Sequence, residues 1–315
     1  MSKIAKIFFL VIILAGAGIL ILRTGVVNFV APEEEVEQLP ATSVLFVGDM
    51  MFDRSIRTIG EKEGYSYLLS CIKDVLIEQT IVVGNLEGPI TSNRSVSVGS
   101  KVGSAPNFQF TFSPKITDAL LLNNVGYVNL GNNHILNFGW SGLEQTRNYL
   151  DKAGIKYFGE PQKDNATTSS IAYIELPQRK IALIGYNEFW KPVASSTVRQ
   201  IQDNKAEDNY VVVYTHWGQE YASSSPAEQN LAHEFIDAGA DVIIGSHPHV
   251  VQEIEVYRDK YIFYSLGNFI FDQWFNEGVM SGLIVKLTFD DQFKDPVVEE
   301  LAVRLNKDGR TCLQD

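Results

Sequence analysis

Cysteine is scarce in this chain, because only Cys71 and Cys312 occur among 315 residues. They stand far apart and form no CxxC pair. This pattern excludes both a thiolate metal site and a dense disulfide framework. Two free thiols and one disulfide are both compatible with the sequence.

Basic residues are also few, since 26 Lys and Arg stand against 38 Asp and Glu, for a formal net charge of -12. Binding to a nucleic-acid backbone needs a basic excess that displaces counterions. We therefore expect no nucleic-acid partner. The hydrophobic share of 45% is ordinary for a globular protein with a sizeable core.

One long apolar run opens the chain, where residues 7–22 carry no charge, Lys3 and Lys6 precede them and Arg23 follows. The run approaches the roughly 20 residues that cross a bilayer, and the preceding lysines favour a cytoplasmic N-terminus. We predict a signal anchor, a single transmembrane helix over residues 1–24. The remaining chain would then lie outside the cytoplasm, held at the cell membrane. A signal peptide cleaved near the small residues 15–17 is the alternative.

Acidic residues follow the apolar run, and residues 32–40 contain four glutamates with little that could be buried. This composition predicts a solvated acidic linker over residues 25–42 and a globular domain over residues 43–315. Residues 92–104 are rich in Ser, Gly and Asn. We expect a long loop there.

Short apolar, β-branched runs recur along the domain and predict buried strands of central sheets. They cover residues 44–47, 80–83, 127–130, 180–184, 210–214, 241–244 and 261–264. Helix-like stretches lie between several of them, at residues 67–79, 116–123, 140–153 and 226–238. Strands that alternate with helices predict an α/β domain. Residues 279–304 indicate successive strands and a second, more antiparallel sheet.

Polar residues follow five of these strands directly, at the place where open α/β sheets hold their ligands. The segments are GD at 48–49, GNLE at 84–87, GNNH at 131–134, THWG at 215–218 and GSHPH at 245–249. Four of the five histidines fall in them, namely His134, His216, His247 and His249. Each alone would fit a turn or a packed core, but their joint placement indicates a metal site.

The donor types in these segments point to a class of metal. His247 and His249 form an i, i+2 pair, which in an extended chain projects both imidazoles to one side. Carboxylate, amide and imidazole ligands without thiolate suit Mn, Fe or Zn. Two such ions a few ångströms apart would hold a phosphoester and lower the pKa of a bridging water. We expect one or two divalent ions.

Six ordered strings resemble the capsule-synthesis branch, the CapA or PGA_cap family, of the calcineurin-like metallophosphoesterases. They are GDMMFDR (48–54), NLEGPIT (85–91), NNHILNFG (132–139), HWGQEY (216–221), GADVIIGSHPHVVQ (239–252) and YSLGNFIFD (264–272). The resemblance covers about residues 44–272. It implies a four-layer α/β/β/α sandwich of two mixed sheets, with metals at the strand ends.

The same resemblance implies roles for individual residues. Asn133, His216 and His247 would bind one metal, and Asp49 and His249 the other. The segment from Asn85 to Glu87 would lie between the two metals. The resemblance also places His134 opposite the substrate, as an electrophile or general acid.

Two positions depart from the hydrolase pattern of the superfamily. Asp49-Met50-Met51 stands where a phosphoesterase has Asp-x-His, and a thioether is a poor ligand for hard divalent ions. Asn85 stands where a bridging aspartate is expected, although Glu87 could replace its charge. Arg54 follows this segment. It would either clamp a substrate carboxylate or phosphate as a catalytic residue, or pair with a nearby acid.

Two functions follow from the resemblance and its departures. The first is a membrane-anchored component that acts through a metal-binding site in the synthesis or export of an anionic extracellular polymer such as poly-γ-glutamate. Membrane-bound synthesis or export proteins would be its partners. The alternative is an active metal-dependent phosphoesterase or γ-glutamyl-type hydrolase at the cell surface.

Overall fold

A computed structural model describes residues 42–78, 81–162, 170–176, 179–190, 194–290 and 295–314. The predicted anchor at residues 1–24 lies outside the described residues, as does the predicted linker at 25–42 apart from its last residue. No helix in the described part of the chain is both long enough and apolar enough to span a bilayer.

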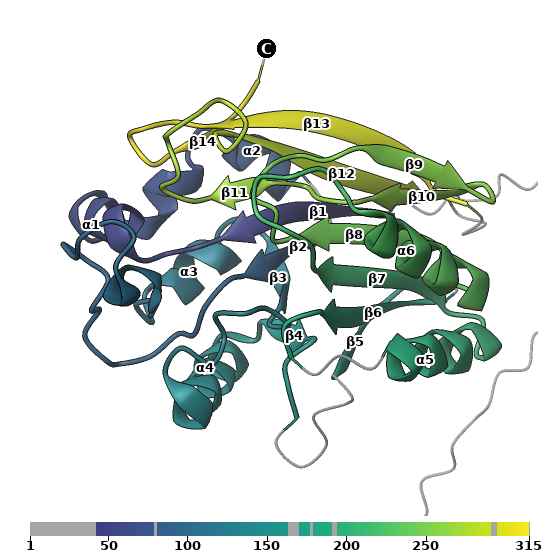
Figure 1. Ribbon diagram of the computed structural model, residues 1–315. Helices are drawn as coiled ribbons and strands as arrows, with labels where there is room; N and C mark the ends of the chain where they lie inside the picture. The colour runs from purple at the N-terminus through teal and green to yellow at the C-terminus, as the bar shows by residue number, and fades with distance from the viewer. Residues whose placement is uncertain are drawn as a thin grey trace, which may run out of the picture. The chain divides into compact units, whose positions relative to one another are not determined.

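Two mixed sheets form the centre of the described chain (Figure 1). In the first, the strand order is β14 (Thr311–Leu313), β13 (Val297–Leu305), β12 (Ser281–Phe289), β1 (Thr42–Met50), β2 (Ile81–Leu86), β3 (Val125–Asn129) and β4 (Lys156–Phe158). β11 (Asn268–Ile270) pairs with β1 off this path. β1 to β4 run parallel, whereas β12, β13 and β14 are antiparallel.

The second sheet has the order β5 (Ile171–Glu175), β6 (Lys180–Asn187), β7 (Tyr210–His216), β8 (Val242–Ser246), β10 (Lys260–Phe263) and β9 (Ile254–Tyr257). Its four inner strands are parallel and its two edge strands are antiparallel. The α/β class and the pair of mixed sheets confirm the prediction from the sequence.

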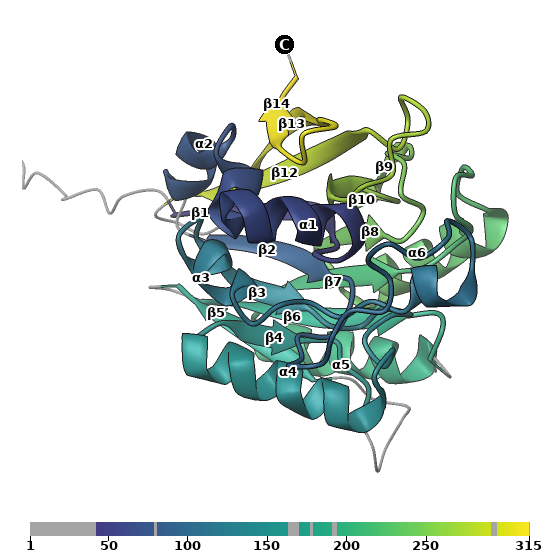
Figure 2. The same cartoon turned by 90° about the vertical axis from the view of Figure 1, so that its left-hand side faces the viewer.

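Helices cover the outer faces of both sheets. They are α1 (Arg54–Glu63), α2 (Lys73–Ile77), α3 (Ile116–Leu121) and α4 (Gly139–Ala153) on the first sheet, and α5 (Ala194–Ala206) and α6 (Pro226–Ala238) on the second. Short 3-10 helices occupy Tyr65–Leu69 and Ala105–Phe108. Figure 1 shows α4 on one side of the pair of sheets and α5 on the other. In Figure 2, α1, α3 and α4 lie toward the viewer.

Alternation along the central strands produces these layers. In β1, Leu45 and Val47 pack under the helices of the first sheet, while Val44 and Phe46 face the second sheet. In β7, Val212 faces the first sheet and Val211 faces α5 and α6. Period-two side chains thus bury both faces of each strand.

Two predicted elements were wrong in part. The helix expected at residues 67–79 divides into a 3-10 turn and the short α2, because the chain bends at Ser70 to Ile72, where Cys71 bonds to Cys312. The strands at residues 279–304 do not form a separate sheet. β12 pairs antiparallel with β1, because Val285 and Leu287 bury against the same inner core as Val44 and Phe46.

Candidate metal centre

The strand ends of both sheets bring the predicted ligands together. Asp49 lies in β1, Glu87 directly follows β2, and His216 ends β7. His247 and His249 lie in the segment after β8. All five side chains are buried.

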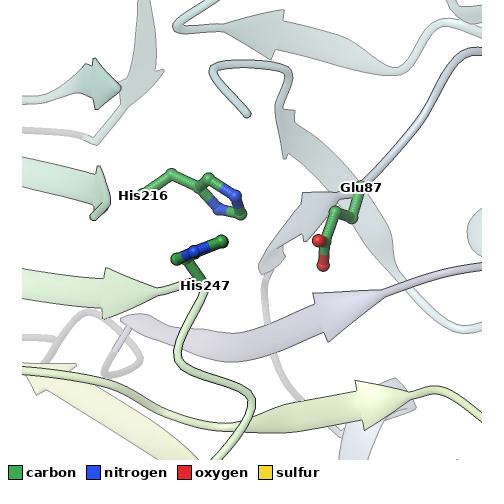
Figure 3. A group of neighbouring side chains, drawn as sticks. All are labelled: Glu87, His216 and His247. Atoms are coloured by element: carbon green, nitrogen blue, oxygen red, sulfur yellow. The ribbon is translucent and has the colours of Figure 1, made fainter. Parts of the chain in front are cut away.

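Two groups of possible metal ligands form there, within the described residues. Glu87, His216 and His247 offer ligand atoms within 4.8 Å of one another, and so do Asp49, Glu87 and His249. Figure 3 shows the His216 and His247 rings beside each other, with the Glu87 carboxylate facing them. Glu87 belongs to both groups, so one carboxylate lies between the two candidate ion positions.

Glu87 has an unusual electrostatic environment. Its side chain is fully buried, and neither carboxylate oxygen accepts a hydrogen bond from the described residues. Burial raises the pKa of Glu87 well above its usual value, and the charge of Asp49 raises it further. A buried carboxylate without hydrogen-bond donors is costly, and a cation removes that cost. The residues present therefore fit a bound metal.

His216 is oriented by its outward nitrogen. Its Nδ1 lies 3.0 Å from the Ser246 hydroxyl oxygen, which itself donates to the Thr215 carbonyl at 2.7 Å. With that hydroxyl proton already engaged, Ser246 accepts from Nδ1–H, and the lone pair of His216 Nε2 is left for the site. Burial lowers the pKa of His216 well below its usual value. His216 is therefore neutral, as a metal ligand must be.

Asn133 and Asn85 occupy different positions around His216. Asn133 Oδ1 lies 3.0 Å from His216 Nε2, a separation that suits two ligands of one ion. Asn85 Nδ2 donates to Asp49 Oδ1 at 2.7 Å, and its Oδ1 accepts from Asn129 and Asn132. The Asn85 amide is therefore engaged in a buried hydrogen-bond network, whereas Glu87 presents unpaired oxygens.

His249 is held in the same manner as His216. The side-chain amide N–H groups of Asn268 donate to backbone carbonyls, including that of Val279 at 3.0 Å. The Asn268 Oδ1 atom therefore faces His249 Nδ1, at 3.0 Å. His249 Nε2 then lies 3.6 Å from Glu87 Oε1. Burial alone would lower the pKa of His249, but the charges of Glu87 and Asp49 raise it to about 9.

The backbone around the histidine pair is strained. His247 has φ 98° and His249 has φ 58°, in a region that non-glycine residues rarely adopt. The expectation of an extended i, i+2 pair is therefore wrong, although the two rings do gather at 5.8 Å between centroids. The His247 N–H donates to Asp49 Oδ2 at 3.1 Å. Strain of this kind is concentrated at functional sites.

His134 and Arg54, the two predicted catalytic residues, border the ligand groups. His134 Nε2 lies 3.9 Å from Glu87 Oε1, and burial lowers its pKa to about 4, so the ring is uncharged at neutral pH. Arg54 forms an ion pair with Asp272, and its guanidinium lies over the rings of Phe110 and Phe271. Of the two roles that the sequence allowed for Arg54, the structure therefore shows the ion pair with a nearby acid.

Comparison with known proteins shows the family. Residues 43–273 match the family described as bacterial capsule synthesis protein PGA_cap. The chain belongs to this family. The capsule biosynthesis protein CapA of Bacillus anthracis is 31% identical over 278 residues, covering 81% of this chain and 66% of the relative. The PGA biosynthesis protein CapA of Bacillus subtilis is 29% identical over 257 residues, covering 77% of this chain and 66% of the relative.

A further relative matches over a shorter part of the chain. A probable polyglutamine synthesis accessory protein of Mycobacterium tuberculosis is 29% identical over 168 residues, covering 45% of this chain and 44% of the relative. The chain spans 66% of the length of the two Bacillus relatives.

Several neighbours in this PGA_cap site were missed from the sequence. Phe189 packs against the His247 ring at 4.4 Å between centroids, and no pattern marks it. Asn268 and Ser246 lie inside the family strings, but sequence does not show that they orient His249 and His216.

Met51 is buried, and its sulfur accepts from the Asp53 N–H at 3.0 Å. His233, the fifth histidine, lies on α6 and pairs with Glu255 of β9.

Proposed function

We propose that this chain holds two divalent transition-metal ions and acts through them in the synthesis or export of a poly-γ-glutamate-type extracellular polymer. The observation that carries the proposal is Glu87, a buried carboxylate that belongs to both ligand groups and accepts no hydrogen bond from the part of the chain that the structure describes. The names of the Bacillus relatives, which refer to capsule and PGA biosynthesis, support the polymer class.

The two ion positions would differ in their ligands. Asn133, His216 and His247 would hold one ion, and Asp49 and His249 the other. Glu87 would lie against both, while Asn85 orients Asp49 instead of bridging. Carboxylate, amide and imidazole donors favour Mn, Fe or Zn. Bound ions would polarise a substrate oxygen and lower the pKa of a water.

Charge limits where a polymer can touch the molecule. The chain carries a formal net charge of -12, which repels an anionic polymer over most of the surface. Contact must therefore be local, and the metal centre supplies the positive charge that such a contact needs. Only a short segment of the polymer would therefore contact the molecule, at the site.

The location we propose is the outer side of the cell membrane, with residues 1–24 as the anchor and membrane-bound synthesis or export proteins as partners. The disulfide between Cys71 and Cys312 supports this location. Disulfides persist in oxidising compartments and are rare in the cytosol.

A second candidate function is hydrolysis of a phosphoester or γ-glutamyl amide bond at the same site. The position of Glu87 favours it, because this carboxylate supplies the shared negative ligand that Asn85 lacks. The uncharged His134 lies beside Glu87, where it could accept or pass a proton. Its role as a general acid remains a prediction.

Metal content tests both candidates. We expect the full-length chain, desalted after incubation with Mn or Zn, to keep about one tight ion and to take up a second in excess metal. Glu87→Gln should lose the second ion and weaken the first, and His216→Ala should abolish the tight one. His233→Ala is the matched control, since that histidine lies outside both ligand groups. Unchanged metal content in Glu87→Gln would overturn the proposal.

Turnover then separates the two candidates. Bis(p-nitrophenyl) phosphate and γ-glutamyl-p-nitroanilide represent the two bond types, and metal-dependent release of p-nitrophenol or p-nitroaniline would favour the hydrolase. Two bound ions without turnover of either compound would favour the synthesis or export role.

A further inference from the structure

A pocket of about 420 Å³ opens beside the metal centre, between the loop at residues 97–108 and the segment at 272–275. This volume lies within the usual range of small-molecule sites. Tyr221 lines the pocket and lies beside the candidate ligand His249. Its ring centroid is 6.2 Å from that of His249, and its N–H donates to the Pro248 carbonyl at 2.8 Å.

Within the described residues, the two charged side chains that line the pocket, Arg54 and Asp272, are paired with each other. The second carboxylate oxygen of Asp272 accepts from the Ser55 N–H at 3.0 Å. An entering carboxylate would have to compete with Asp272 for Arg54 and would lie beside its negative charge. The pocket therefore favours an uncharged group.

Exposed aromatic rings and small polar side chains make up much of the lining. Phe275, Phe108 and Tyr221 are 64%, 49% and 46% exposed, and the Tyr221 and Phe275 rings meet edge to face at 5.4 Å. Ser55 and Thr58, which are exposed, supply hydroxyl groups. A sugar ring matches this lining, because its C–H face packs on aromatic rings and its hydroxyls pair with neutral polar groups.

Hydrogen bonds link the pocket to a metal ligand. Gln273 Nε2 donates to the Tyr221 hydroxyl at 2.9 Å, and Gln273 Oε1 accepts from Asn268 Nδ2 at 3.1 Å. Asn268 Oδ1 in turn lies 3.0 Å from His249 Nδ1. The wall of the pocket and the orientation of His249 thus share one continuous network. A single substrate that spans both places would contact both ends of it.

We propose that this pocket binds an uncharged sugar unit of the substrate whose anionic or scissile group lies at the metal centre. The proposal rests on the proposed function for the metal half of that substrate. The sugar half rests on the pocket alone. The substrate would then be a conjugate, with a neutral sugar on one side of the reacting group.

Binding of chitotriose, a neutral trisaccharide, tests the pocket in the full-length chain with EDTA present. We expect millimolar or tighter binding by calorimetry, and Phe275→Ala should weaken it about tenfold through the lost ring contact. Phe275 is well exposed, so this variant should fold. Tyr173→Ala is the matched control, because Tyr173 is an exposed aromatic residue on β5 and does not line the pocket.

Three results would overturn the sugar assignment. They are no binding of chitotriose, binding that Phe275→Ala leaves unchanged, and tighter Phe275-dependent binding of γ-linked triglutamate or of trialanine. Because EDTA is present, these results do not depend on metal. A failure of the metal-content test with intact chitotriose binding would refute the metal centre and leave the sugar site, and the reverse pattern would refute the sugar site alone.

Discussion

Glu87 and Asn85 lie two residues apart and have opposite surroundings. The Asn85 amide meets partners on both sides, whereas the Glu87 carboxylate is buried without a hydrogen-bond donor from the described chain. A charged group in that position is stable only beside positive charge. In the described structure the nearest positive charge is His249, and a metal ion would supply more.

The pH dependence of metal binding should differ between the two ligand groups. His216 and His247 have lowered pKa values, to about 3 for His247, mainly through burial, so both imidazoles are neutral at pH 6–8. The pKa of His249, which burial alone would lower, is instead raised to about 9 by Glu87 and Asp49, so an ion must displace a proton there. Glu87 belongs to both groups, so the free energy needed to remove its proton affects the binding of both ions equally. Raising the pH removes the competing proton, and the second ion should tighten by about tenfold more per pH unit than the first, up to pH 9.

Chelator competition with Zn at pH 6, 7 and 8 measures both affinities. His233→Ala should leave both slopes unchanged. Equal slopes for the two ions would contradict the assignment of His249 to the second position.

The sequence predicted most residues of the candidate site but not the hydrogen-bond partners of each one. Asp49, Glu87, His216, His247 and His249 could be found because polar residues follow buried strands, where parallel sheets place ligands. The hydrogen bonds of the Asn85 amide could not be predicted, since they depend on Asn129 and Asn132, which lie on β3 and in the loop that follows it. The pairing of Arg54 depends on Asp272, 218 residues away.

At the scale of elements, β1 delivers Asp49 through a close backbone contact. Gly48 lies against Gly267, which immediately precedes β11, and a Cβ added at Gly48 would meet the Gly267 carbonyl oxygen at 2.0 Å. The register between β1 and β2 shifts between Val47 and Asp49. Glycine thus permits an irregular strand end that turns Asp49 into the site.

Gly48→Ala should lower the free energy of unfolding by about 1–3 kcal/mol, because the obstacle is backbone and cannot rotate away. Gly126→Ala in β3 is the matched control, since its Cβ would have 3.9 Å to the nearest atoms. That control should be neutral or slightly stabilising. Urea unfolding monitored by fluorescence compares the two variants. Equal stability of both would show that the contact at Gly48 relaxes freely.

Elements with strong local signals could be predicted from the sequence. The central strands are buried on both faces and appear as unbroken apolar runs, and α4 and α6 end at glycines with left-handed φ, Gly154 and Gly239. The helices α1 and α5 are largely polar, and the edge strands β5 and β9 are partly exposed, so none of the four was predicted. Their structure depends on the neighbours against which they pack.

At the scale of the molecule, one disulfide joins distant parts of the first sheet and its helices. Cys312 on β14 bonds to Cys71, which follows the 3-10 turn at Tyr65–Leu69, across a separation of 241 residues. The sequence did not decide whether this bond forms, because the bond depends on β14 pairing at the edge of the first sheet. A crosslink lowers the conformational entropy of the unfolded chain, and the effect grows with the length of the loop that it closes.

The location of the domain gives the last prediction, and the disulfide is its readout. If the anchor directs the domain outside the cytoplasm, the full-length chain should fractionate with membranes, and protease added to intact cells should digest the domain. Maleimide added after denaturation without reductant should find neither Cys71 nor Cys312 free, because an oxidising compartment preserves the bond. A chain that lacks residues 1–40, retained in the cytoplasm, is the control and should label at both cysteines. Free thiols in the full-length protein, or protection from external protease together with recovery in the soluble fraction, would contradict an extracytoplasmic domain. The candidate metal centre would then have to act inside the cell, where a finished extracellular polymer is absent.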